Sequence, residues 1–179
     1  LGHSMGGLVA MEMAFRVPEA LRGVIVVDIA PRPHYARVSD VLEAMSRIQV
    51  RTLESKKEVD QELAKAIAEP EVRQFVLTNL IVSESGLNWR INLPVLQAFL
   101  VESQAYQPAP TDIYEGPALF IRGEKSGYIR DQDFTMIQHH FPAASFKTVP
   151  EAGHWVHYEN PEALIQFVEE FLQQIQSGL

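Results

Sequence analysis

Residues 2–7 read Gly-His-Ser-Met-Gly-Gly and match the pattern G-x-S-x-G. This pattern is typical of a strained turn between a strand and a helix, which presents the hydroxyl of Ser4 at the top of a sheet. The flanking glycines are expected because a Cβ would collide with neighbouring backbone in so tight a turn. Residues 8–16 have the apolar character of a buried helix, and the N–H of Met5 at its start can face a developing oxyanion. The sequence therefore predicts Ser4 as a nucleophile and Met5 as an oxyanion-hole residue.

Strands and helices alternate toward both ends of the chain. Val24–Val27 is a continuous β-branched run, and a run without alternation is typical of a strand covered on both faces. Residues 118–121 and 145–149 predict two further strands, and residues 133–141 predict a helix between them. A last helix is expected at Asn160-Pro161, where an N-cap residue precedes a proline. This order predicts the α/β class, with a parallel sheet flanked by helices.

The middle of the chain has a different character. Residues 35–106 predict three or four helices with charged faces and no strand, and residues 86–88 are interpreted as a break between two helices. We expect residues 31–110 to form a helical lid that is inserted into a core of residues 1–30 and 111–179.

Composition excludes several classes of function. The 179 residues carry 15 Lys and Arg against 23 Asp and Glu, a net charge of −8 without a basic cluster, which argues against nucleic-acid or anionic-membrane partners. No apolar run approaches the roughly 18 to 20 residues of a membrane span. The chain has no cysteine and no cluster of metal-ligand type, so neither a metal nor another cofactor is expected. The expected partner is a small molecule, and the default expectation for location is the cytoplasm.

A serine nucleophile needs a general base, and the chain has six histidines. His154 is the strongest candidate because it follows the strand predicted at 145–149 in a glycine-containing loop, where a base can reach the serine. His157 is a weaker rival, expected to be hydrogen-bonded near the start of the last helix. His3 is expected to point away from the serine and to give packing or polar support. The remaining histidines are expected at the surface or in a loop without a clear role: His139, His140 and His34.

Four segments of the chain combine into a recognisable set. They are residues 2–7, residues 27–31 (Val-Asp-Ile-Ala-Pro), residues 122–126 (Arg-Gly-Glu-Lys-Ser) and residues 153–157 (Gly-His-Trp-Val-His). Together they resemble the α/β-hydrolase superfamily, and within it the YbfF-type esterases and their mitochondrial relatives. The resemblance covers the whole chain but only the C-terminal part of that fold, so it implies an α/β-hydrolase fold whose N-terminal strands are missing.

The acid of the catalytic triad is the member that needs most argument. Most α/β-hydrolases carry it in a pattern like Gly-Glu-x-Asp after the strand at 118–121, but here Ser126 stands at that position. A serine cannot hold a charge against an imidazolium, whereas Asp28, at the end of the preceding strand, can. The resemblance implies this relocation, with Asp28 as the acid and Ser126 assisting. An ordinary strand-end role for Asp28 stays open, as do three other acids: Glu124, Asp131 and Asp133.

These residues predict a serine hydrolase that cleaves carboxylic esters, with thioesters as a second substrate class, through an acyl-enzyme. The alternatives are a non-catalytic ligand-binding protein on a hydrolase scaffold and a C–C bond hydrolase. A dehalogenase would need an aspartate in place of Ser4. The strand that should precede Gly2 and pair with Val24–Val27 is absent from the sequence, which would leave an apolar sheet edge uncovered. We therefore expect residues 1–179 alone to behave as a fragment, weak or inactive as an enzyme and prone to associate.

Overall fold

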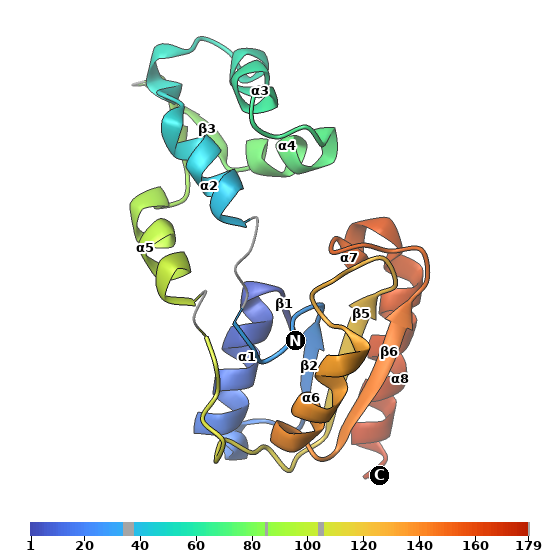
Figure 1. Cartoon of the computed structure of the whole chain (residues 1–179). Helices are drawn as coiled ribbons and strands as arrows, with labels where there is room; N and C mark the ends of the chain where they lie inside the picture. The colour runs from blue at the N-terminus through green and yellow to red at the C-terminus, as the bar shows by residue number, and fades with distance from the viewer. Residues whose placement is uncertain (34–37, 85, 104–105, 179) are drawn as a thin grey trace. The chain divides into compact units, whose positions relative to one another are not determined.

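The computed structural model describes residues 1–33, 38–84, 86–103 and 106–178 of the chain (Figure 1). The chain divides into two compact units. Unit 1 consists of Leu1–Pro33 and Tyr106–Leu179, and unit 2 consists of His34–Ala105. Each unit has a hydrophobic core of its own. His34, which the sequence places in a loop, lies outside the described residues.

Unit 1 is built on a four-stranded sheet in the order β1-β2-β5-β6, and all three strand pairs are parallel. Because parallel neighbours need a crossover connection, helices link them: α1 (Met5–Arg16) leads from β1 to β2, and α6 (Phe134–His140) leads from β5 to β6. The predicted parallel sheet flanked by helices is confirmed. The strands are β1 (Gly2–His3), β2 (Val24–Val27), β5 (Ala118–Gly123) and β6 (Ala144–Val149).

Helices cover both faces of this sheet, as the unbroken apolar run of β2 predicts (Figure 1). Val26 belongs to the core cluster that contains buried residues of α1 and α6. Its neighbour Ile25 belongs to a second cluster, which contains Phe171 of α8 (Pro161–Gln176). Successive side chains of a strand point to opposite faces, so all four residues of β2 are buried. Short helical turns complete the unit: η1 (Pro18–Ala20), η3 (Asp131–Asp133) and α7 (Val156–Glu159).

The last helix begins where the sequence predicts it. The side-chain Oδ1 of Asn160 accepts a hydrogen bond from the N–H of Ala163 at 3.2 Å, and Pro161 occupies the first helical position. The cap satisfies one of the amides that a helix N-terminus leaves without an internal partner. The cap thereby defines the start of α8, and α7 lies between α8 and the loop that carries His154.

The described part of unit 2 contains helices and an antiparallel strand pair around a core of its own. Val59 and Leu63 of α3 are fully buried in this core, and Ser55 caps α3 by accepting a hydrogen bond from the N–H of Glu58. Its elements are α2 (Val38–Arg47), η2 (Val50–Thr52), α3 (Lys56–Ala64), α4 (Pro70–Leu77), β3 (Leu80–Ser83), β4 (Gly86–Trp89) and α5 (Leu93–Ser103).

The prediction that residues 35–106 contain no strand is wrong. β3 and β4 pair in antiparallel fashion, with Leu80 opposite Trp89 and Ser83 opposite Gly86. Gly86 has a φ of 99°, which glycine adopts without the clash of a Cβ. Sequence reasoning interpreted residues 86–88 as a break between helices, because strands of four residues are too short to show clear alternation.

The expectation that the partner strand of β2 ends before Gly2 is also wrong, although β1 pairs with only the last two residues of β2. Gly2 and His3 themselves form a short parallel strand in register with Val26 and Val27. The ladder continues when the N–H of Ser4 donates to the carbonyl oxygen of Val27 at 2.9 Å. A strand of two residues leaves no periodicity in the sequence by which it could be recognised.

Two features are absent from the described part of the chain. Among those residues, no helix combines the length and the apolar character that crossing a membrane requires. No group of three or more His, Asp or Glu side chains in the same residues is placed to hold a metal ion.

Candidate active site

The turn from β1 to α1 places Ser4 at the carboxyl end of the sheet. Ser4 has a φ of 53°, in the left-handed region that non-glycine residues rarely occupy. A Cβ at Gly2 would lie 2.0 Å from the carbonyl oxygen of Gly6, so the turn needs glycine at position 2. The same expectation for Gly6 is wrong, because a Cβ there would meet nothing within 4 Å. The crowding in this turn lies at the Cβ position of Gly2, against the backbone of Gly6, and not at the Cβ position of Gly6 itself.

Ser4, His154 and Asp28 form a chain of hydrogen bonds across the ends of the strands. Nε2 of His154 lies 3.0 Å from Oγ of Ser4, and Nδ1 lies 2.8 Å from Oδ2 of Asp28. Because a carboxylate oxygen accepts, the contact with Asp28 favours the tautomer with its proton on Nδ1. Nε2 is then the acceptor that faces the serine hydroxyl. This is the arrangement that a general base requires.

Asp28 is fully buried, and other polar groups satisfy its carboxylate. The N–H of Gly123 donates to Oδ1 at 3.1 Å, and the hydroxyl of Ser126 donates to Oδ2. A buried carboxylate needs such donors, because burial without them is strongly unfavourable. Asp28 also has a left-handed φ, of 52°, so the chain turns sharply where β2 ends. Ser126 thus lies on the carboxylate, at the site where most relatives of this fold class are expected to carry the acid.

Met5 is the first residue of α1. The amides of a helix's first turn have no carbonyl partner within the helix. The Met5 N–H therefore lies at the positive end of the helix dipole, directly after Ser4 in the chain. Its side chain is 40% exposed and lies outside the core.

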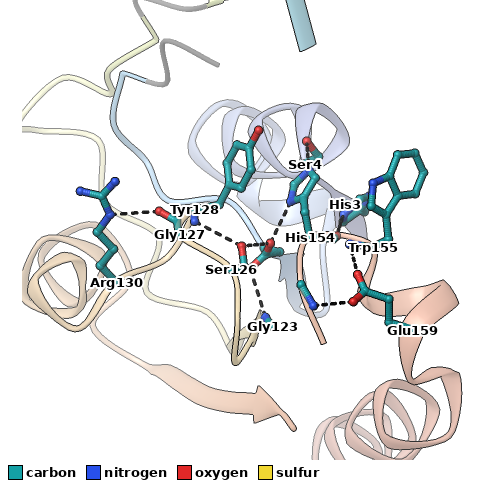
Figure 2. A network of polar contacts seen from close by, with 12 residues as sticks. His3, Ser4, Gly123, Ser126, Gly127, Tyr128, Arg130, His154, Trp155 and Glu159 are labelled. Carbon is teal, nitrogen blue, oxygen red and sulfur yellow. Dashed lines mark hydrogen bonds and ion pairs between the residues drawn. The ribbon is translucent and has the colours of Figure 1, made fainter. Parts of the chain in front are cut away.

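Two aromatic rings lie against His154 (Figure 2). The ring of Tyr128 stacks on the imidazole with centroids 4.0 Å apart and an interplanar angle of 23°. The ring of His3 is tilted by 39° against the imidazole of His154, with the two ring centroids 4.8 Å apart. Nε2 of His3 donates to the carbonyl oxygen of His154 at 2.8 Å. Burial lowers the pKa of His3 below its ordinary value of 6.5, and the nearby His154 and His157 lower it further. His3 thus gives polar support to the loop that carries His154.

The alternative acids have other partners. Oδ1 of Asp133 accepts from Nε of Arg32 at 3.0 Å, and Oδ2 accepts from the N–H of Arg130 at 2.9 Å. Asp131 pairs with Arg122. Oε2 of Glu124 accepts from the N–H of Glu151. Each of these contacts keeps the carboxyl away from the imidazole that Asp28 contacts.

The other histidines divide into exposed and buried residues. His139 is exposed, and so is His157 in α7, whose ring lies 5.0 Å from that of His3. The expectation that His140 lies at the surface is wrong, because only 6% of it is exposed. Its Nδ1 bonds to the carbonyl oxygen of Asp112 at 2.7 Å, and its ring packs near Phe15. The chain returning toward β5 covers this end of α6, and a helical pattern does not reveal such cover.

Sequence reasoning missed three groups at this site. The N–H of Gly123 at the end of β5 contacts Asp28, and the ring of Tyr128 contacts the ring of His154. The carboxylate of Glu159 contacts the backbone of the loop that carries His154. A backbone donor leaves no trace in a sequence. Tyr128 and Glu159 could have been suspected only from their places near Ser126 and in the loop that carries His154.

The fold agrees with comparison to known proteins. Residues 1–167 match the model of the alpha/beta hydrolase family, and the chain belongs to that family. The resemblance to the α/β-hydrolase superfamily, and to YbfF-type esterases within it, is therefore confirmed.

Individual relatives carry names of ester-cleaving enzymes. The chain is 34% identical over 178 residues to the sn-1-specific diacylglycerol lipase ABHD11 of Mus musculus, covering 96% of this chain and 58% of that protein. It is 28% identical over 173 residues to Esterase YbfF of Escherichia coli (strain K12), covering 96% and 66%. Among solved structures, a marine microorganism esterase matches with a TM-score of 0.90 at 32% identity, covering 95% of this chain and 68% of that one. The chain thus spans somewhat more than half the length of its mammalian relative.

Proposed function

We propose that the protein is a serine hydrolase that cleaves carboxylic esters through an acyl-enzyme on Ser4. The observation that carries the proposal is the unbroken chain of contacts from Ser4 through His154 to Asp28. The names of the relatives, which include a lipase and several esterases, support the ester class.

Acylation begins with attack of Oγ of Ser4 on the substrate carbonyl. As the bond forms, Nε2 of His154 takes the hydroxyl proton, and the imidazole becomes positively charged. The same proton then goes to the leaving alcohol. In the second half of the reaction, a water molecule attacks the acyl carbonyl while Nε2 of His154 takes one of its protons. The bond between the acyl carbon and Oγ of Ser4 then breaks, His154 returns the proton to Oγ, and the carboxylic acid leaves. Asp28 holds the imidazole in the required tautomer and stabilises its charged form.

The tetrahedral intermediate places a negative charge on the former carbonyl oxygen. The N–H of Met5 donates to that oxygen, with help from the dipole of α1. Ser126 acts one step further away, because its hydroxyl bond to Oδ2 of Asp28 helps to keep the buried carboxylate in place.

The test is hydrolysis of p-nitrophenyl acetate and butyrate by the protein that contains residues 1–179, together with labelling of Ser4 by a fluorophosphonate. We expect Ser4→Ala to abolish the labelling and to lower kcat/KM by about 10⁴-fold or more. Ser177→Ala is a matched control, since Ser177 lies at the end of α8 and its Oγ donates to the carbonyl oxygen of Gln173 in that helix. Unchanged hydrolysis in Ser4→Ala would contradict the proposal.

A non-catalytic binding protein on the same scaffold gives a different result. It would retain an ester ligand without turnover, and the fluorophosphonate would not label it. Thioester cleavage stays a prediction, to be tested with an acyl thioester in the same assay. The role of residues 31–110 as a lid also stays a prediction, and it would appear as altered acyl-chain preference in variants of unit 2.

A further inference from the structure

The loop that carries His154 is held through its backbone by a single carboxylate. Oε2 of Glu159 accepts the N–H of Gly153 at 2.8 Å, and Oε1 accepts the N–H of Trp155 at 3.1 Å. The two amides belong to the residues directly before and directly after His154. Glu159 thus binds the backbone on both sides of His154, whereas the ring of His154 points toward Ser4 (Figure 2).

The surrounding groups leave room for this bridge and complete it. A Cβ at Gly153 would lie 3.2 Å from Oε1 and 3.4 Å from Oε2 of Glu159, so glycine leaves the carboxylate its space. On the carbonyl side of the same residue, Nε2 of His3 donates to the oxygen of His154 at 2.8 Å. Three side-chain hydrogen bonds therefore fix the short backbone segment from Gly153 to Trp155.

Glu159 is well placed to do this because α7 is a single turn. Glu159 is the last residue of α7 and Trp155 is its N-cap, and the N–H of Glu159 donates to the carbonyl oxygen of Trp155 at 2.9 Å. Its side chain then reaches back over that turn to the amides. A charged acceptor makes stronger hydrogen bonds than a neutral one, so one exposed acid can hold the loop.

We propose that Glu159 is a positioning residue, which sets the place of His154 by fixing the backbone on both sides of it. The proposal rests on the proposed function, because it assigns Glu159 to the base of that reaction. The imidazole must lie within hydrogen-bond reach of Ser4 and Asp28 at once, at 3.0 and 2.8 Å. A displacement of about 1 Å in such a group can lower a rate about a hundredfold. Smaller, fluctuating displacements of a loosened loop lower it less.

The experiment compares Glu159→Gln and Glu159→Ala in p-nitrophenyl butyrate hydrolysis. The amide oxygen of Gln can accept one of the two N–H groups, whereas Ala accepts neither. We expect kcat to fall about threefold in Glu159→Gln and about tenfold in Glu159→Ala, with KM nearly unchanged. Amide hydrogen exchange at Gly153 and Trp155 should become faster in the same order.

The matched control is Glu151→Gln. Glu151 lies on the same loop, but its carboxylate pairs with Lys125 at the surface, with 81% of its side chain exposed. We expect this variant to keep kcat and the slow exchange at both amides.

Two results overturn the proposal, and both are distinct from failure of the proposed function. One is an unchanged kcat in Glu159→Ala, in a protein whose wild type is active and labelled at Ser4. The other is equal losses in the Gln and Ala variants with a matching fall in melting temperature, which marks a general loss of stability. If the wild type neither turns over nor is labelled, the proposed function fails, whereas the exchange measurement still reports whether Glu159 holds the loop.

Discussion

Unit 1 and unit 2 have separate apolar cores, but they bring polar side chains together over very different distances along the chain. In unit 1, Ser4 contacts His154 across 150 positions, and Asp28 contacts it across 126. In the described part of unit 2, polar contacts join nearer residues, for example Gln97 with Ser46 across 51 positions. A parallel sheet collects the ends of distant strands at one edge, whereas packed helices mainly join segments that follow one another.

This difference teaches where chemistry can be built. The candidate site uses the ends of β1, β2 and β5 and the loop after β6, so four segments contribute to it. Each carries one or two side chains, and the sheet fixes the positions of all of them. In unit 2 the described polar contacts include exposed pairs such as Arg47 with Glu43 and the partly buried pair of Arg73 and Asp60, which are 13 positions apart in the chain. Under the proposed function, the reacting groups Ser4, His154 and Asp28 therefore all belong to unit 1.

The sharpest test of that assignment concerns the acid. We expect Asp28→Asn to lower kcat by about 10³- to 10⁴-fold, because an amide stabilises neither the required tautomer nor the imidazolium. Ser126→Ala removes one hydrogen bond to the carboxylate and should lower kcat by about tenfold. Steady-state hydrolysis of p-nitrophenyl butyrate measures both. The reverse order would show that the acid is not at the end of β2.

A pair of glycines compares the two units directly. A Cβ at Gly123 would lie 2.1 Å from the carbonyl oxygen of Gly153, so Gly123→Ala must push β5 and the loop of His154 apart. We expect a loss of about 10²-fold in kcat. Gly86 of unit 2 needs glycine for its φ of 99° instead, and Gly86→Ala should destabilise the hairpin by about 1–3 kcal/mol.

The hydrolysis assay separates these two effects when it is paired with unfolding in urea. Gly86→Ala should leave the kcat for a small ester unchanged while the urea midpoint falls. A kcat loss in Gly86→Ala as large as that in Gly123→Ala would break the comparison, because unit 2 would then share in positioning the reacting groups.

The sequence allowed prediction of what local chemistry controls. The motif around Ser4 and the apolar run before Asp28 placed both residues at strand ends, and the structure puts them within reach of His154. Their catalytic roles stay predictions. The hairpin of β3 and β4 was missed because its strands have only four residues each. The burial of His140 was missed because it depends on a segment that is distant in sequence.

The groups that hold the site are harder to predict than the groups that react. Glu159 bonds to backbone amides of Gly153 and Trp155, and any residue type offers such amides. Tyr128 lies on His154 only because the loop after β5 turns back on itself near Ser126. Such contacts depend on loop conformation, to which the spacing of apolar residues gives no clue.

The smallest expected effect concerns the pH dependence of stability, and it again belongs to unit 1. Burial holds the pKa of His3 below its ordinary value of 6.5, so in mildly acidic solution the unfolded chain binds a proton that the folded chain does not. The contribution of His3 to the free energy of unfolding is therefore fully present above pH 6.5 and is lost as the pH falls toward the lowered pKa. In His3→Gln this contribution disappears, while the Gln amide can still donate to the carbonyl oxygen of His154.

We expect the difference in unfolding free energy between pH 7.5 and pH 5.5, measured with urea, to be smaller in His3→Gln than in the wild type. The two proteins differ only at position 3, so contributions from groups distant from that residue cancel in this comparison. His139→Gln is the control for loss of a histidine, since His139 lies at the surface of α6. An equal or larger difference in His3→Gln would mean that the neutral form of His3 is not what the folded site prefers. The acid sensitivity of unit 1 would then have to arise elsewhere than at the turn that carries Ser4.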